Sequence, residues 1–116
     1  MELNLSVEEL LEELNVSITI TDREGNIIYL NQASAKVNAG GGGKQLVGQQ
    51  VRACHNEYSR AIIEMLMEGQ THVYTIDKRG QHKLIYQTPW KKNGQVQGLI
   101  EFSMVLPDNM PNYVRS

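Results

Sequence analysis

Residues 21–31, which read TDREGNIIYLN, decide the fold because they predict the end of one strand, a tight turn and a returning strand. The strand begins upstream, where residues 16–21 alternate apolar and polar side chains as a half-buried strand does. The Asp22 carboxylate can accept bonds from amides of its own turn, and Gly25 can take the positive φ that the turn needs. Residues 27–30 then return, so the stretch predicts a β-hairpin.

Helices are expected on both sides of this hairpin. Asn31 leaves the second strand and can cap a short helix through Val37. Near the start of the chain, Ser6 and Glu9 fit a capping box. The helix that they begin has an apolar stripe and a mostly acidic opposite side, so we expect it to pack on another surface. The stripe comprises Val7, Leu10, Leu11 and Leu14.

The strongest helical pattern covers residues 56–68, with Gly69 as its C-terminal signal. Its apolar residues recur at helical spacing and are Tyr58, Ala61, Ile62, Met65 and Leu66. Four consecutive glycines, residues 40–43, precede it and predict a loop, because glycine loses the most backbone entropy on ordering. One long helix is therefore expected between the hairpin and the rest of the chain.

Three strands are predicted after the long helix, over residues 71–77, 83–90 and 96–106. Asn93-Gly94 is the strongest short hairpin signal in the chain and joins the last two. In the last strand, Val96, Gly98, Ile100, Phe102 and Met104 share one face, and Gln97, Glu101 and Ser103 share the other. The order of elements predicts an α+β fold with an antiparallel sheet and helices on one side.

Composition narrows the class of protein. The 116 residues fit one domain, and a net charge of −2 without a basic stripe argues against nucleic acid as a partner. One cysteine forms no internal disulfide, and no apolar run approaches the ~20 residues that span a bilayer. The acidic start does not fit a signal peptide. A cytoplasmic protein without a membrane partner is expected, with a flanking helix (1–14), a main domain (15–106) and a flexible tail (107–116).

The residues from Asp22 to Asn31 match D-x-x-G-x-I-x-x-x-N, and Leu46-Val47-Gly48 matches the L-x-G run that precedes a long helix in PAS domains. Over residues 15–106 the chain resembles that family. The resemblance implies a five-stranded antiparallel sheet with short helices and one long helix over a central pocket. It also implies a non-catalytic sensor of a small ligand, which forms a homodimer through its N-terminal helix or signals to a partner protein.

A sub-group of the family, the haem-binding oxygen sensors, takes its proximal histidine from a run resembling H-x-x-Y, which His55-Asn56-Glu57-Tyr58 matches. By this resemblance His55 is the axial ligand, with Met104 or Cys54 as substitutes. Ile62 belongs to the apolar wall for the porphyrin. The candidates for the propionates are Arg52, His72 and Lys83. The predicted cofactor-binding residues are thus Cys54, His55, Tyr58, Ile62 and Met104, with His55 as the metal ligand if haem binds.

Other interpretations of the same stretch stay open. Asn56 can simply cap the long helix, with Cys54 as a small buried apolar residue. A ligand-free interaction domain would use the flanking helix and the outer sheet surface instead. An enzyme is disfavoured, since the adjacent side chains of Cys54 and His55 diverge and no third residue orients them. His72 and His82 are expected at the surface or the rim of the sheet.

Overall fold

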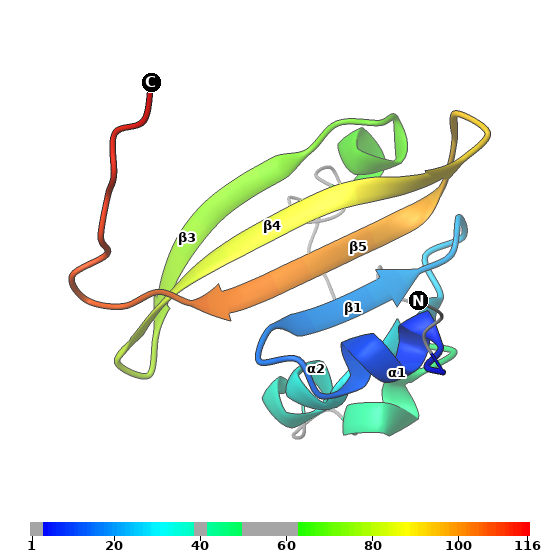
Figure 1. Ribbon diagram of the computed structural model, residues 1–116. Coiled ribbons are helices and arrows are strands. Elements are labelled where there is room, and N and C mark those ends of the chain that lie inside the picture. The colour runs from blue at the N-terminus through cyan, green and yellow to red at the C-terminus, as the bar shows by residue number, and fades with distance from the viewer. Residues whose placement is uncertain (1–3, 39–41, 50–62) are drawn as a thin grey trace.

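The computed structural model describes residues 4–38, 42–49 and 63–116 (Figure 1). Its main feature is one five-stranded antiparallel sheet in the order β2-β1-β5-β4-β3. This confirms the predicted sheet and its short helices. The elements are α1 (Val7–Glu12), β1 (Ser17–Thr21), β2 (Ile27–Leu30), α2 (Gln32–Val37), the 3-10 helix η2 (Gly43–Leu46), β3 (His72–Lys78), β4 (Gln81–Lys92) and β5 (Gln95–Val105).

The hairpin of β1 and β2 forms as its sequence predicts. Asp22 Oδ1 accepts bonds from the amides of Glu24 at 3.0 Å and Asn26 at 2.9 Å. Gly25 has a φ of 86°, in the left-handed region that favours glycine. The turn therefore returns the chain so that Thr19 pairs with Leu30.

Two further hairpins join the long strands. The Asn93-Gly94 turn has φ values of 52° and 79°, and the Arg79-Gly80 turn has 53° and 79°. Positive φ at both central residues is the geometry of a type I′ turn, whose twist matches the flanking strands. The predicted Asn93-Gly94 turn is confirmed, and the Arg79-Gly80 turn has the same geometry.

Gly98 marks the closest approach between strands β5 and β1. A Cβ at this position would lie 2.0 Å from the carbonyl oxygen of Thr21. That oxygen also accepts a bond from Trp90 Nε1 at 2.8 Å. The Thr21 hydroxyl in turn accepts from the amide of Leu99 at 3.1 Å. A residue without a side chain is thus required where β4, β5 and β1 are joined.

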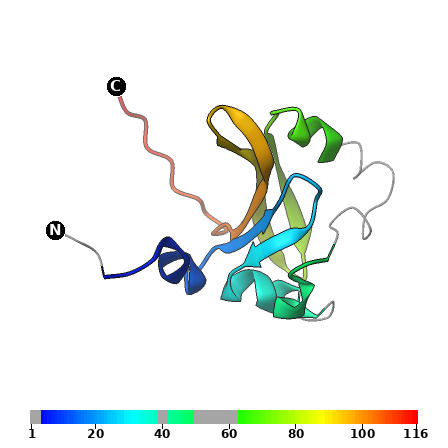
Figure 2. The same cartoon turned by 90° about the vertical axis from the view of Figure 1, so that its right-hand side faces the viewer.

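The two faces of the sheet are covered by different helices. Leu99 packs with Ile63 and Leu66 in one buried cluster, so residues 63–67 cover the face that carries Leu99. We call this the inner face, and α2 lies on it as well, because Ser34 bonds Thr19. Helix α1 lies on the opposite, outer face, where Tyr29 bonds Glu12 (Figure 2).

The predicted long helix falls largely outside the described residues, which omit 50–62. Residues 63–67, at the end of the predicted span, are helical, and Gly69 follows with a φ of 101°. Within the described part of the chain, α1 and α2 are the longest helices, with 6 residues each. The length of the helix before residue 63 stays a prediction.

Asn31 is fully buried, and its side chain joins three segments. Its Oδ1 accepts bonds from the amides of Ile18 and Ser34, both at 3.0 Å, and so caps α2 as predicted. Its Nδ2 donates to the carbonyl oxygens of Leu11 at 3.0 Å and Val16 at 2.8 Å. One amide side chain thereby holds α1, β1 and α2 together.

Replacing Asn31 with alanine should therefore be strongly destabilising. Two amides and two carbonyls lose their partner together, and we expect the free energy of unfolding to fall by about 3 kcal/mol. Denaturant titration measures the change. Asn38→Ala is the control, since the exposed Asn38 side chain donates only to Ser34, to its carbonyl at 2.9 Å and its hydroxyl at 3.4 Å, and its loss should cost less than about 1 kcal/mol. Equal losses in the two variants would contradict the central role of Asn31.

Candidate functional site

Most of the cofactor-binding residues predicted from sequence, namely Cys54, His55, Tyr58 and Ile62, lie outside the described residues. Met104 is described and pairs with Leu84 on β4. Since side chains alternate along a strand, Met104 shares the outer face with Phe102, opposite Glu101. The position of Met104 relative to the other four lies outside what the described residues show, and its role as a ligand stays a prediction.

The inner face carries a row of polar side chains across four neighbouring strands. His72 pairs with Gln87, Gln87 pairs with Glu101, and Glu101 pairs with Thr19. Paired residues of adjacent strands lie on the same face, so these four form one row, which we call the polar row. The Thr19 hydroxyl extends it to Ser34 of α2, at 2.5 Å between the two oxygens.

Hydrogen bonds give the polar row a direction. His72 Nδ1 lies 3.1 Å from Gln87 Oε1, so Nδ1 carries the proton and the amide oxygen accepts it. The Gln87 amide nitrogen is then free to donate to the Glu101 carboxylate. Tyr74 lies beside this chain, with its ring centroid 4.7 Å from that of His72.

Burial dominates the electrostatics of the row. It raises the pKa of Glu101, and the bond from Gln87 opposes the rise only in part. The pKa of Tyr74 is raised first by burial and then by the negative charge of Glu101. Clustered groups whose pKa values are shifted by burial occur often at functional sites, although structural networks shift them as well. Glu101 is suited to accept hydrogen bonds from a bound ligand when ionised, or to donate one when protonated.

Sequence reasoning missed Glu101, Gln87 and Thr19 as a group. It separated the two faces of β5 correctly but did not identify which face is covered. Leu99, which lies between Gln97 and Glu101 on the polar side, was the available signal, because it is buried in the core cluster. His72 and His82 were expected at the surface or rim: His72 is half-buried at the start of the edge strand β3, and His82 is exposed and lies 2.7 Å from Asp77.

Helix α1 is attached to the outer face mainly by polar contacts. Glu12 lies 2.6 Å from Lys44 Nζ and accepts a bond from the Tyr29 hydroxyl at 3.2 Å. Burial and the charge of Glu12 raise the pKa of Tyr29 to about 12. The predicted apolar stripe remains largely open, with exposed fractions of 70% for Val7, 44% for Leu10 and 45% for Leu14. Only its fourth member, Leu11, is half-buried.

The described part of the chain offers neither a metal site nor a membrane-spanning helix. No group of three or more His, Cys, Asp or Glu side chains there could hold a metal ion. Nor is any helix among those residues both long and apolar enough to cross a membrane.

Comparison with known proteins supplies the family. The model of the PAS fold matches residues 11–106, whereas no curated protein matches the chain. The PAS domain of BvgS from Bordetella pertussis is 16% identical, with a TM-score of 0.62 over 88% of this chain and 85% of that one. The Aer2 receptor of Vibrio cholerae, described as a dual PAS-haem oxygen sensor, is 18% identical, with a TM-score of 0.59 over 79% and 95%.

A third similar structure is the complex of VqmA from Vibrio cholerae with its ligand and DNA. It is 21% identical, with a TM-score of 0.65 over 90% of this chain. The match covers 53% of VqmA, so this chain corresponds to about half of that protein. The family match spans most of the sequence, and the TM-scores show that these structures share its fold. The chain therefore belongs to the PAS fold family, a family of sensory domains in signalling proteins.

Proposed function

We propose that this chain is a non-catalytic, cytoplasmic sensory module that binds a small polar ligand against the inner face of its sheet. The observation that carries the proposal is the Glu101 carboxyl, which is withdrawn from water in the middle of the polar row. A buried carboxyl is unfavourable unless a partner compensates its lost hydration. Gln87 supplies one such partner, and a ligand with hydrogen-bond donors would supply the rest.

The surroundings of Glu101 define the chemistry of this ligand. On either side along β5 lie the apolar Leu99 and the hydroxyl of Ser103. Across the strands, Thr19 and Gln87 offer groups that both donate and accept. Such a mixture of apolar wall and few polar groups is typical of small-molecule sites. The similarity to VqmA, whose structure was determined with a ligand bound, supports this choice.

The buried carboxyl has a direct test in the pH dependence of stability. Because the folded-state pKa of Glu101 is raised, its stabilising contribution is present below the ordinary glutamate value of 4.5 and is lost as the pH rises through the folded-state pKa. Glutamine does not ionise, so the Glu101→Gln variant does not lose stability at this position as the pH rises. The free energy of unfolding of the variant, relative to wild type, should therefore increase from about pH 4 to about pH 8. Exposed Glu24→Gln should show no such trend, and a flat difference for both would place Glu101 in water.

Ligand binding itself is tested on protein purified from cells. Native mass spectrometry should show a mass above that of the chain, lost after denaturation and at least tenfold less abundant in Glu101→Gln than in Glu24→Gln. A wild-type mass equal to that of the chain alone, with or without small-molecule extracts added back, would support a ligand-free interaction domain.

Haem is the second candidate ligand, favoured by the similarity to the Aer2 receptor and by the His55-Asn56-Glu57-Tyr58 run. In this version His55 would be the axial ligand, since neutral imidazole binds iron. An absorption spectrum of the same preparation, before and after adding haem, separates the candidates. A Soret band that shifts or disappears in His55→Ala would assign haem, while a spectrum indifferent to His55 would remove it.

We further propose that the signal passes through a homodimer, or to a partner protein, by way of α1. The exposed side chains of Val7, Leu10 and Leu14 form an apolar surface that the polar contacts of Glu12 leave free. Apolar patches that are left open on a small domain mark contacts between proteins.

Changing Leu10 and Leu14 together to glutamate should shift the mass in solution from dimer to monomer. Sedimentation over a range of concentrations measures it, and circular dichroism should show an unchanged fold because both side chains are about half exposed. Val105→Glu, at a 55% exposed site on β5, is the matched control. An unaltered mass in the double variant would exclude α1 as the interface.

A further inference from the structure

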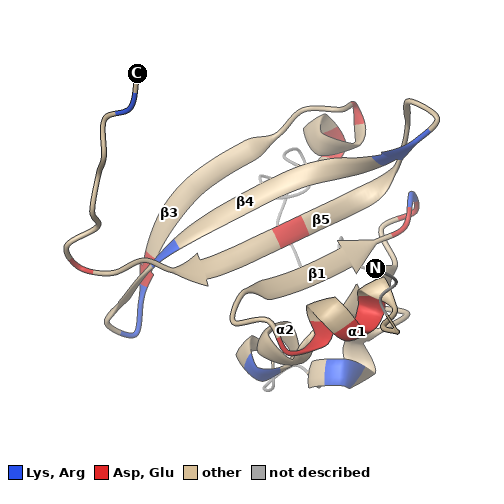
Figure 3. Ribbon diagram, viewed as in Figure 1, with Lys and Arg blue, Asp and Glu red and all other residues tan. Residues whose placement is uncertain are grey.

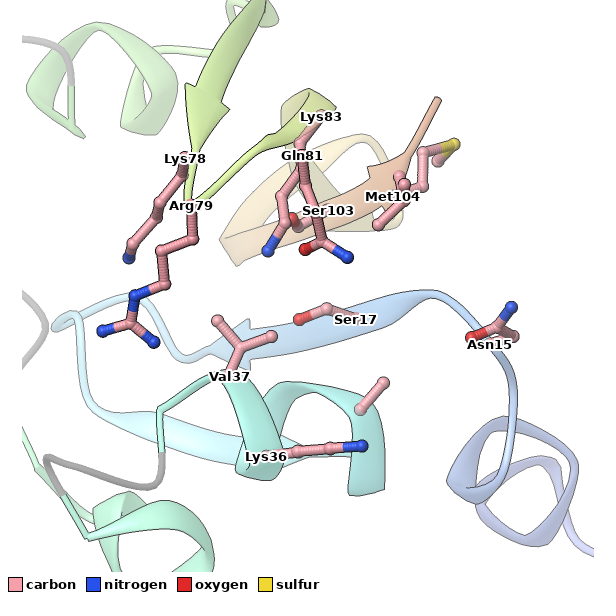
Figure 4. A pocket seen from close by; sticks show the side chains of 12 residues that line it. Asn15, Ser17, Lys36, Val37, Lys78, Arg79, Gln81, Lys83, Ser103 and Met104 are labelled. Carbon is pink, nitrogen blue, oxygen red and sulfur yellow. The ribbon is translucent and has the colours of Figure 1, made fainter. Parts of the chain in front are cut away.

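A pocket on the inner face, separate from the polar row, is markedly basic. It has a volume of about 390 Å³ and lies between α2, the start of β1 and the end of the β3–β4 hairpin (Figure 4). Four cationic side chains line it, and none of the described residues that line it carries a carboxylate. Lys36 comes from α2, Lys78 and Arg79 from the end of β3 and its turn, and Lys83 from β4.

These cations have no compensating charge among the described residues. None of the four is in an ion pair there, and Lys83 is half-buried. Asp77, on the neighbouring position of β3, pairs with His82 and belongs to the outer face. Glu101 lies two positions along β5 from Ser103, which lines the pocket, and it faces Gln87. Four like charges around one cavity repel one another until an anion enters.

The turn at Arg79 supports a role for this charge. Type I′ turns strongly prefer Asn, Asp or Gly at the first central position, as the Asn93-Gly94 turn shows. Arg79 occupies that position with a φ of 53°, a conformation that is unfavourable for a long side chain. The sequence therefore keeps a guanidinium at the pocket mouth against the preference of the backbone.

We propose that this pocket binds a small multivalent oxyanion, a molecule with two or more phosphate or carboxylate groups. Its volume is within the range of small-molecule sites, roughly 300–1,000 Å³. The Arg79 guanidinium suits bidentate contact with an oxyanion, and the lysines supply point charges. The Ser17 and Ser103 hydroxyls can donate hydrogen bonds to the same ligand. None of the described residues that line the pocket is aromatic, so they offer no ring on which a nucleobase would stack.

The test compares two double variants with equal changes of charge. Arg79→Asn with Lys83→Gln removes two pocket cations, and asparagine is favourable at the turn, so this variant should fold at least as well as wild type. Lys91→Gln with Lys92→Gln removes two exposed cations from the opposite end of β4 (Figure 3). Titration calorimetry at constant ionic strength uses pyrophosphate and citrate as probes, with sulfate as the small divalent reference.

We expect wild type and the Lys91/Lys92 variant to bind pyrophosphate, citrate or both with the same affinity and a defined stoichiometry. The Arg79/Lys83 variant should bind at least tenfold more weakly. Preference for pyrophosphate would assign a phosphate-bearing ligand, and preference for citrate a polycarboxylate. Equal weakening in both variants, or no saturable binding by wild type, would overturn the proposal. Because Glu101 does not line this pocket and neither Arg79 nor Lys83 belongs to the polar row, each site is tested with its own variants and probes, and failure here and failure of the ligand site at the polar row are distinguishable.

Discussion

The Asn31 amide is the interaction on which the rest of the structure depends. Its four hydrogen bonds satisfy both oxygen lone pairs and both N–H groups, at a position with 0% exposure. A carboxylate or an alkyl group of similar size would leave at least two backbone groups without partners, and unsatisfied buried groups are costly. One side chain thus positions the hairpin of β1 and β2, helix α2 on the inner face and helix α1 on the outer face. The position of α2 on the inner face is fixed as a consequence.

Turn chemistry made much of the fold predictable. Asp22 and Gly25 act through their own backbone neighbours, as does Asn31 where it caps α2, so these effects follow from sequence alone, whereas the long-range bonds of Asn31 do not. The Asn93-Gly94 turn set the register of the last hairpin for the same reason. Strand ends were less certain, and β4 extends beyond the predicted residues 83–90 to Gln81–Lys92. The central strands continue as far as their neighbours pair with them, which is a property of the whole sheet.

The candidate site could not be predicted in the same way. Alternation separates the two faces of β5 but does not say which one a helix covers. A central strand of a sheet with helices on both faces loses part of its exposure on each side, so Glu101 resembles a solvent-facing residue in sequence and is half-buried in the fold. The polar row depends on the pairing of four strands that are distant in sequence. It appears only when His72, Gln87, Glu101 and Thr19 are placed in register.

The inner face separates its charges along β5. Glu101 and Ser103 are two residues apart, or about 7 Å along an extended strand. Nearby cations would normally lower the pKa of a carboxyl, yet the pKa of Glu101 is raised. The cations of the basic pocket are mostly exposed, and water screens them, whereas the loss of hydration at Glu101 is local and unscreened. Burial therefore prevails, and the two sites keep opposite preferences on one surface.

The polar row is also joined to α1 through bonded groups. Thr19 contacts Ser34, the Ser34 amide is held by Asn31, and Asn31 holds the Leu11 carbonyl. Contiguity alone transmits nothing, because a ligand shifts an equilibrium only by its difference in affinity for two arrangements. The bond between Thr19 and Ser34 is the link through which such a difference can act. A ligand that displaces the bond between Thr19 and Ser34 would loosen α2 beside Asn31, the residue that anchors α1. The apolar stripe of α1 would then respond to occupancy of the inner face without any direct contact with the ligand.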